Sequence, residues 1–146
     1  MLPLIGTVAI TLGVLGELRK HAPTAWPAAR PDWIAIVPLS ATAQQRATAW
    51  QQSGLLHGGE AEALALAGEL KPDWFLTDDS AARLVAEALK MEAHGSLGVV
   101  LWCAAQNLIQ KHDAESLLAN LEQSSLWLSP RVRAQARAAL GNMFGS

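Results

Sequence analysis

Residues 59–90, "GEAEALALAGELKPDWFLTDDSAARLVAEALK", contain a helix, a strand and a second helix in succession. Residues 59–70 are rich in Ala, Leu and Glu, which favour a helix, and the Lys-Pro pair that follows ends it. The short apolar run at 73–77 predicts a buried strand. In residues 80–90, apolar side chains recur at the spacing of one helical face. This alternation of helix and strand is typical of α/β folds.

The rest of the chain continues the alternation. Apolar and β-branched runs predict strands at 7–11, 33–39 and 91–94. Periodicity and start or stop signals predict helices at 12–20, 41–54, 97–110, 113–124 and 129–143. The proline-rich residues 21–32 are expected to form a loop. We therefore predict an α/β fold in which helices cover a short parallel sheet, and the length of 146 residues favours one domain, residues 1–146.

Several of these helices carry further signals. Thr11, Asp113 and Ser129 each precede or open a helical pattern, and we expect them to cap it. Residues 97–110, "LGVVLWCAAQNLIQ", are apolar on nearly every face, which predicts a buried helix.

Composition excludes several functional classes. The formal net charge is −2, so no global positive field draws the chain to nucleic acid and any such contact is local. The single cysteine, Cys103, excludes an internal disulfide and lies in an apolar run, where a packed structural thiol is expected. The histidine spacing matches no zinc motif. The first apolar segment has basic residues after it and none before it, so we expect no export signal. The segment is also too short and too rich in glycine for a membrane helix, so we expect a cytoplasmic protein without membrane contact.

Three acidic residues are expected to meet at one edge of the predicted sheet. Helices between parallel strands run antiparallel to them, so a helix begins near the carboxyl ends of the strands. Glu60 opens the helix before the strand that Asp78 closes, and Glu17 lies about two turns past the first strand. Ser96 follows the fourth strand and emerges at the same edge. Ligands of open α/β sheets bind there, and clustered carboxylates suit Mg²⁺ or Mn²⁺.

Each of these residues also has a structural interpretation. Glu60 at a helix N-terminus is favoured by the helix dipole without any function. Asp79 or Ser80 can cap the helix that follows, Glu17 can be solvated, and Ser96 can be a helix cap. Both interpretations stay open at the level of the sequence.

Four motifs between residues 55 and 109 resemble the PIN-domain superfamily, in particular a branch of small prokaryotic predicted nucleic-acid-binding proteins related to VapC-type toxins. They are "GEAEALALA" at 59–67, "FLTDD" at 75–79, "AAR" at 81–83 and "GSLGVV" at 95–100. The resemblance implies a PIN-like three-layer α/β/α fold and a metal-dependent ribonuclease. It is looser toward both ends of the chain.

The resemblance also implies roles for individual residues. Glu17, Glu60 and Asp78 match members of the acidic catalytic cluster and would bind Mg²⁺ or Mn²⁺, with Asp79 a further ligand or a group behind the ligands. Such ions activate a water and neutralise charge on the scissile phosphate. Arg83 would contact a phosphate oxygen, with a surface salt bridge as the alternative. Ser96 would orient a water or a metal ligand.

One family feature is missing from the sequence. Members of the superfamily begin with a strand that carries an Asp, in a "DTSPLI"-like stretch, and nothing comparable precedes "LPLIGTVAIT" at 2–11. A proline typical of the family near Thr11 is also absent. The sequence therefore predicts an N-terminally truncated PIN-like domain with an incomplete acidic cluster.

Two functions follow. The first is a Mg²⁺-dependent endoribonuclease that acts on RNA, as the toxin paired with an antitoxin protein. The second is a catalytically impaired PIN-like module that acts by homodimerisation or partner binding, with Arg131, Arg133 and Arg137 as a local basic patch or simply part of an exposed helix. A receiver-like nucleotide-binding domain is disfavoured because the chain has neither a GxGxxG loop nor a Walker lysine.

Overall fold

The computed structural model describes residues 7–21, 33–124, 126 and 128–145. The chain divides into two compact units, Met1–Ala93 and His94–Ser146. The expectation of a single domain remains a prediction. Most of the loop predicted at 21–32 lies outside the described residues.

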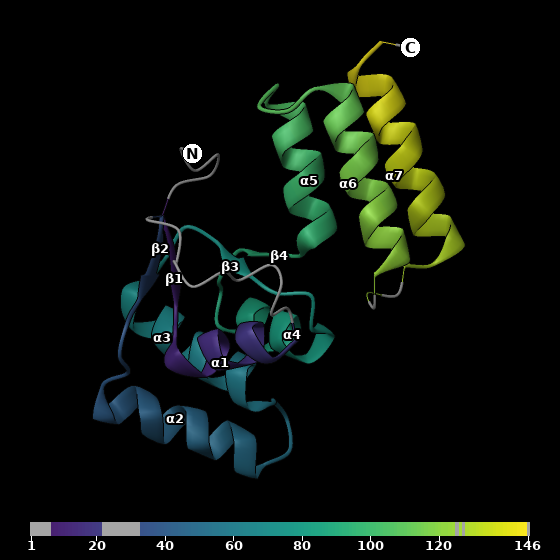
Figure 1. The fold of residues 1–146 in the computed structure, drawn as a ribbon. Coiled ribbons are helices and arrows are strands. Elements are labelled where there is room, and N and C mark those ends of the chain that lie inside the picture. The colour runs from purple at the N-terminus through teal and green to yellow at the C-terminus, as the bar shows by residue number, and fades with distance from the viewer. Residues whose placement is uncertain (1–6, 22–32, 125, 127, 146) are drawn as a thin grey trace. The chain divides into compact units, whose positions relative to one another are not determined.

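The first unit alternates strands and helices as predicted (Figure 1). The elements run β1 (Val8–Ile10), α1 (Leu12–His21), β2 (Ile34–Ile36), α2 (Ala41–Gln52), α3 (Gly58–Leu70), β3 (Phe75–Leu76), α4 (Ser80–Ala88) and β4 (Ala93–His94), whose last residue begins the second unit. The second unit consists of α5 (Ser96–Ala105), α6 (Lys111–Gln123) and α7 (Pro130–Met143). The predicted α/β fold class is confirmed.

The strands are short and form two small sheets. β1 and β2 pair in parallel, with Val8 opposite Ile34 and Ile10 opposite Ile36. β3 pairs with β4, and the Phe75 amide donates to the Glu92 carbonyl at 2.8 Å. Among the described residues these two pairs are separate sheets and share no strand. Two-stranded sheets depend on packing against helices for stability. Leu15 of α1 packs against Ile10 and Ile34 of the β1–β2 sheet, and Phe75 of β3 belongs to the core cluster of α2, α3 and α4.

The first unit is held together by small and aliphatic side chains of its helices. Leu64 is fully buried on α3, and alanines of α2, α3 and α4 pack around it, which lets these helices approach closely. The stripe predicted on α4 is partly right: Ala82 and Ala86 are fully buried, whereas Leu89 is 40% exposed near the end of the helix. A separate cluster of Ile10, Leu15 and Ile34 joins α1 to the β1–β2 sheet.

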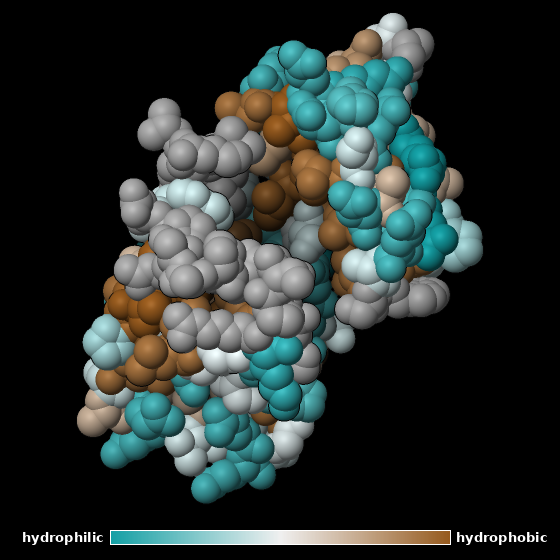
Figure 2. Space-filling view, viewed as in Figure 1, coloured by the Kyte–Doolittle hydropathy of each residue, from teal (hydrophilic) through white to brown (hydrophobic). Residues whose placement is uncertain are grey.

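The second unit is a group of three helices with its own core. Leu118 on α6 is fully buried and packs with Ala104 of α5 and Leu140 of α7. The prediction that 97–110 is a buried helix needs correction. The helix ends at Ala105 because Asn107 adopts a left-handed backbone conformation, with φ 58°. Within α5 only Cys103 and Ala104 are buried, because α6 and α7 contact one side of a helix that is apolar on all sides. Hydrophobic surface gathers over α5 in Figure 2.

The predicted helix boundaries hold closely where capping residues mark them. Thr11 Oγ1 accepts from the Val14 amide at 3.2 Å, and Ser129 Oγ accepts from the Val132 amide at 3.1 Å, so both predicted caps are confirmed. α6 begins two residues before Asp113, and Gln110 is its N-cap. Asp113 instead accepts from the Gln110 amide at 3.2 Å, one half of a capping box. No helix of the described segments is long and apolar enough to cross a membrane.

Candidate functional site

The N-terminus of α3 receives a carboxylate from α1. Glu17 Oε1 accepts a hydrogen bond from the Gly59 amide at 3.0 Å, across 42 residues of sequence. Gly59 immediately precedes Glu60, so Glu17 and Glu60 are brought to the same end of one helix. Glu17 is exposed, as expected for a solvated side chain, and it makes this contact in addition.

This contact provides an acceptor for an amide in the first turn of α3. The first amides of a helix have no partner within the helix. His57 is the N-cap of α3 and makes no side-chain capping bond, so Glu17 supplies the missing acceptor. A negative charge at this position is also favoured by the helix dipole. Glu60, in the first turn of α3, gains the same dipole stabilisation.

A second long-range contact joins the same two helices, with the carboxylate now on α3 and the amide on α1. Glu62 Oε1 on α3 accepts from the Gly13 amide on α1 at 3.3 Å. No individual role was predicted for Glu62, Gly13 or Gly59, because none of them lies at a strand end. A detectable signal was nevertheless present, since each helix carries a glycine about one turn before a glutamate.

Asp78 lies in the turn between β3 and α4. Hydrogen bonds of the neighbouring residues stabilise this turn. The Asp79 amide donates to Thr77 Oγ1 at 3.1 Å, and Arg83 Nη2 donates to the Thr77 carbonyl at 3.3 Å. Arg83 therefore binds the backbone beside Asp78, and it forms no ion pair within the described part of the chain.

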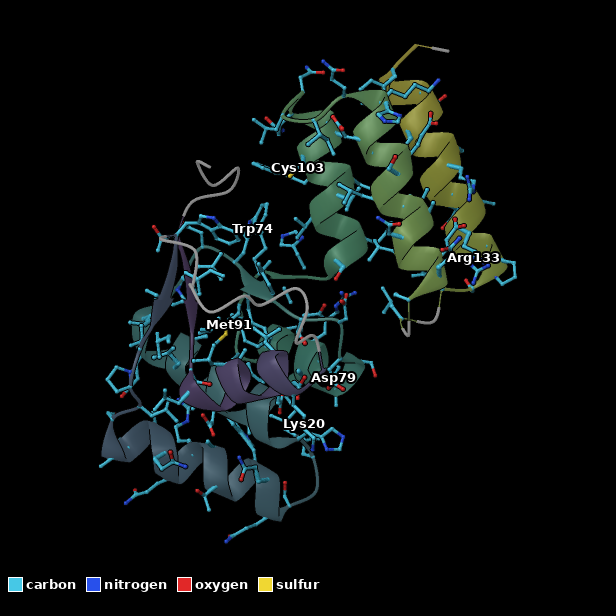
Figure 3. All side chains as sticks on the ribbon, in the orientation of Figure 1. Lys20, Trp74, Asp79, Met91, Cys103 and Arg133 are labelled. Carbon is cyan, nitrogen blue, oxygen red and sulfur yellow. The ribbon has the colours of Figure 1, made fainter. Side chains whose placement is uncertain are left out.

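Asp79 is the N-cap of α4. Its Oδ2 accepts from the Ala82 amide at 2.8 Å, which confirms the capping interpretation and rules out Ser80 as the cap (Figure 3). Ser96 is the first residue of α5, and Gly95 is the N-cap, so the expectation that Ser96 caps this helix is wrong. Ser96 belongs to the second unit, whereas the other predicted site residues belong to the first.

Among the described residues, no three acidic side chains form a compact cluster. Within residues 7–21, 33–124, 126 and 128–145, no three His, Cys, Asp or Glu side chains approach closely enough to hold a metal ion. The chemistry of the donors nevertheless fits Mg²⁺ or Mn²⁺, because carboxylate oxygens are their preferred ligands. Oε2 of Glu17 and both carboxylate oxygens of Glu60 have no hydrogen-bond partner among those residues. The three-acid site stays a prediction.

Comparison with known proteins identifies the family. A family model described as PIN domain matches residues 1–142, nearly the whole chain. Neither the curated proteins nor the solved structures include a significant match. The alternating helices and strands of the first unit and the parallel pairing of β1 with β2 agree with the PIN-like fold. The chain therefore belongs to the PIN-domain family, whose general function is of the nuclease type and depends on divalent metal ions.

Proposed function

We propose that the protein is an endoribonuclease that depends on Mg²⁺ or Mn²⁺ and is the toxin of a toxin–antitoxin pair. The observation that supports this most strongly is the Glu17–Gly59 hydrogen bond, which brings a carboxylate from α1 to the residue next to Glu60. Two of the three expected acidic ligands thus share one helix end in a chain of a nuclease-type family.

Glu17, Glu60 and Asp78 would hold the metal ion, which lowers the pKa of a bound water and offsets charge on the phosphate. Asp79 would support these ligands without binding the metal ion directly, because its Oδ2 already caps α4 and its backbone amide donates to Thr77 Oγ1. The cap fixes the start of α4, and through it the turn that carries Asp78.

Arg83 would bind the substrate. A guanidinium has five N–H donors, and Nη2 uses one of them on the Thr77 carbonyl. The other donors have no partner within the described segments and can reach an RNA phosphate oxygen. The bond to Thr77 would keep Arg83 beside Asp78 while it does so.

RNA cleavage by the purified chain tests this proposal. We expect cleavage that EDTA abolishes and that added Mg²⁺ or Mn²⁺ restores. Asp78→Ala should lower the rate by orders of magnitude. Asp73→Ala is the matched control, because Asp73 is an exposed aspartate just before the same strand and has no hydrogen bond within the described residues. Cleavage that survives Asp78→Ala at the level of the Asp73→Ala control would reject the site assignment.

A second function is supported by the absence of a three-acid cluster from the described residues. In it, the chain is a catalytically impaired PIN-like module that acts by homodimerisation or partner binding. Of the three arginines of α7, Arg137 is paired with Glu122 at 2.7 Å, which leaves Arg131 and Arg133 for a basic patch. Tight, saturable Mn²⁺ binding together with RNase activity would exclude this alternative.

A further inference from the structure

Two reciprocal hydrogen bonds connect α1 and α3. The Gly13 amide of α1 donates to Glu62 of α3, and the Gly59 amide of α3 donates to Glu17 of α1. Gly13 and Glu17 are one turn apart, as are Gly59 and Glu62, and they pair in reverse order. The two helices therefore run antiparallel along this contact. We call these four residues the α1–α3 clamp.

At both glycines of the α1–α3 clamp, the glutamate carboxylate occupies the space that a Cβ atom would take. A Cβ atom at Gly13 would lie 2.7 Å from each carboxylate oxygen of Glu62. At Gly59 the three atoms closest to an added Cβ all belong to the Glu17 carboxylate, and they are closer still. Such distances are shorter than any normal contact, so each carboxylate occupies the space that a larger residue would fill.

Glu62 is on α3 with Glu60 but does not face it. Residues two positions apart on a helix point in different directions, so Glu62 is poorly placed to bind the same ion as Glu60. The contact that Glu62 does make is with α1, at the turn before Glu17. Its effect on the acidic site is therefore indirect.

We propose that Glu62 is a positioning residue of the acidic site. By binding the Gly13 amide it holds α1 in the register that places the Glu17 carboxylate at Gly59, beside Glu60. The exposed Glu17 side chain has several rotatable bonds and many conformations, and the bond between the Gly13 amide and Glu62 limits where the backbone of Glu17 can lie. This inference rests on the proposed function, because Glu17 and Glu60 are taken as ligands of the metal ion.

Mn²⁺ binding by calorimetry, with hydrogen exchange of the Gly59 amide in the metal-free protein, tests the role of Glu62. Glu62→Ala should weaken Mn²⁺ binding about tenfold, as for other residues that orient ligands, and speed exchange at Gly59. Glu62→Gln should stay within about threefold of the wild type, because the side-chain carbonyl still accepts from Gly13. Gly13→Ala, which keeps Glu62 but displaces its carboxylate, should behave like Glu62→Ala.

Glu87→Ala is the control, because Glu87 is exposed on α4 and its side chain makes no hydrogen bond within the described part of the protein. Circular dichroism establishes that each variant is folded. If Glu17→Ala loses Mn²⁺ binding while Glu62→Ala and Gly13→Ala keep it, the positioning role is refuted and the proposed function stands. If the wild type binds no Mn²⁺ and cleaves no RNA, the proposed function fails, and the role of Glu62 fails with it.

Discussion

The Glu17–Gly59 contact predicts that Gly59→Ala lowers the stability of the wild type but raises the stability of a Glu17→Ala variant. Alanine is more favourable than glycine in a helix, by up to about 1 kcal/mol in the interior and less in the first turn. Gly59→Ala should nevertheless destabilise the wild type, because the new Cβ would collide with the Glu17 carboxylate and displace it from the Gly59 amide.

The magnitude follows from the capping bond. Loss of a helix cap costs about 1 kcal/mol, and the exposure of Glu17 argues against a larger value. With a gain of about 0.5 kcal/mol from alanine in the first turn, Gly59→Ala should destabilise the wild type by about 0.5 kcal/mol. In a Glu17→Ala background the carboxylate is absent, and the same change should stabilise by about 0.5 kcal/mol. The double-mutant cycle then gives a coupling free energy of about 1 kcal/mol.

Urea unfolding monitored by circular dichroism measures the four free energies. The relevant transition is the one that unfolds residues 1–93, since the chain has two compact units. Gly16→Ala on α1 is the matched control, because nothing lies within 4 Å of a Cβ at that position. It should stabilise both backgrounds equally, by up to about 1 kcal/mol. If Gly59→Ala has the same effect with and without Glu17, the contact is not formed in solution.

Two further predictions concern α4 and α5. Asp79→Ala should destabilise the protein by about 1 kcal/mol through loss of the α4 cap, whereas Asp79→Asn, which keeps an acceptor for the Ala82 amide, should cost at most a few tenths, as measured by urea unfolding. Burial raises the pKa of the Cys103 thiol, so less of the reactive thiolate is present at any given pH. Iodoacetamide should therefore modify Cys103 far more slowly in the native protein at pH 8 than in urea. Equal rates in the two conditions would show that the thiol is not buried.

The sequence predicted the order and type of the elements because each has a strong local signal. α3 was predicted to within one residue, since its alanines and leucines favour a helix and Lys71, in a left-handed conformation with φ 50°, ends it before Pro72. The end of α5 was missed because the apolar run continues through Leu108 and Ile109 while the backbone already turns at Asn107. Apolar periodicity reports burial and helix formation, and it does not report a single residue with positive φ.

The candidate site was predictable only in part, for a physical reason. Strand ends and helix starts can be located from local patterns, which placed Glu60 and Asp78. The contacts of Glu17 and Glu62 depend on how α1 packs against α3, and no local pattern fixes that packing. The two glycines were the available clue, since a glycine inside the first turn of a helix lowers its stability and usually has a packing reason.

Glu17 can cap α3 and bind a metal ion at the same time, but the metal site then needs a further ligand. A carboxylate has two oxygens, and Oε1 is used on the Gly59 amide. The N-terminus of α3 carries about half a positive charge, which stabilises Glu17 and Glu60 but opposes a divalent cation close by. Two carboxylates at such a position are a weak cation site on their own. A ligand whose charge does not lie at the N-terminus of α3 is needed to overcome the dipole. Asp78, in the turn between β3 and α4 that Thr77, Asp79 and Arg83 stabilise, is the acidic residue that can supply it. Metal affinity should therefore depend more on Asp78 than on either glutamate.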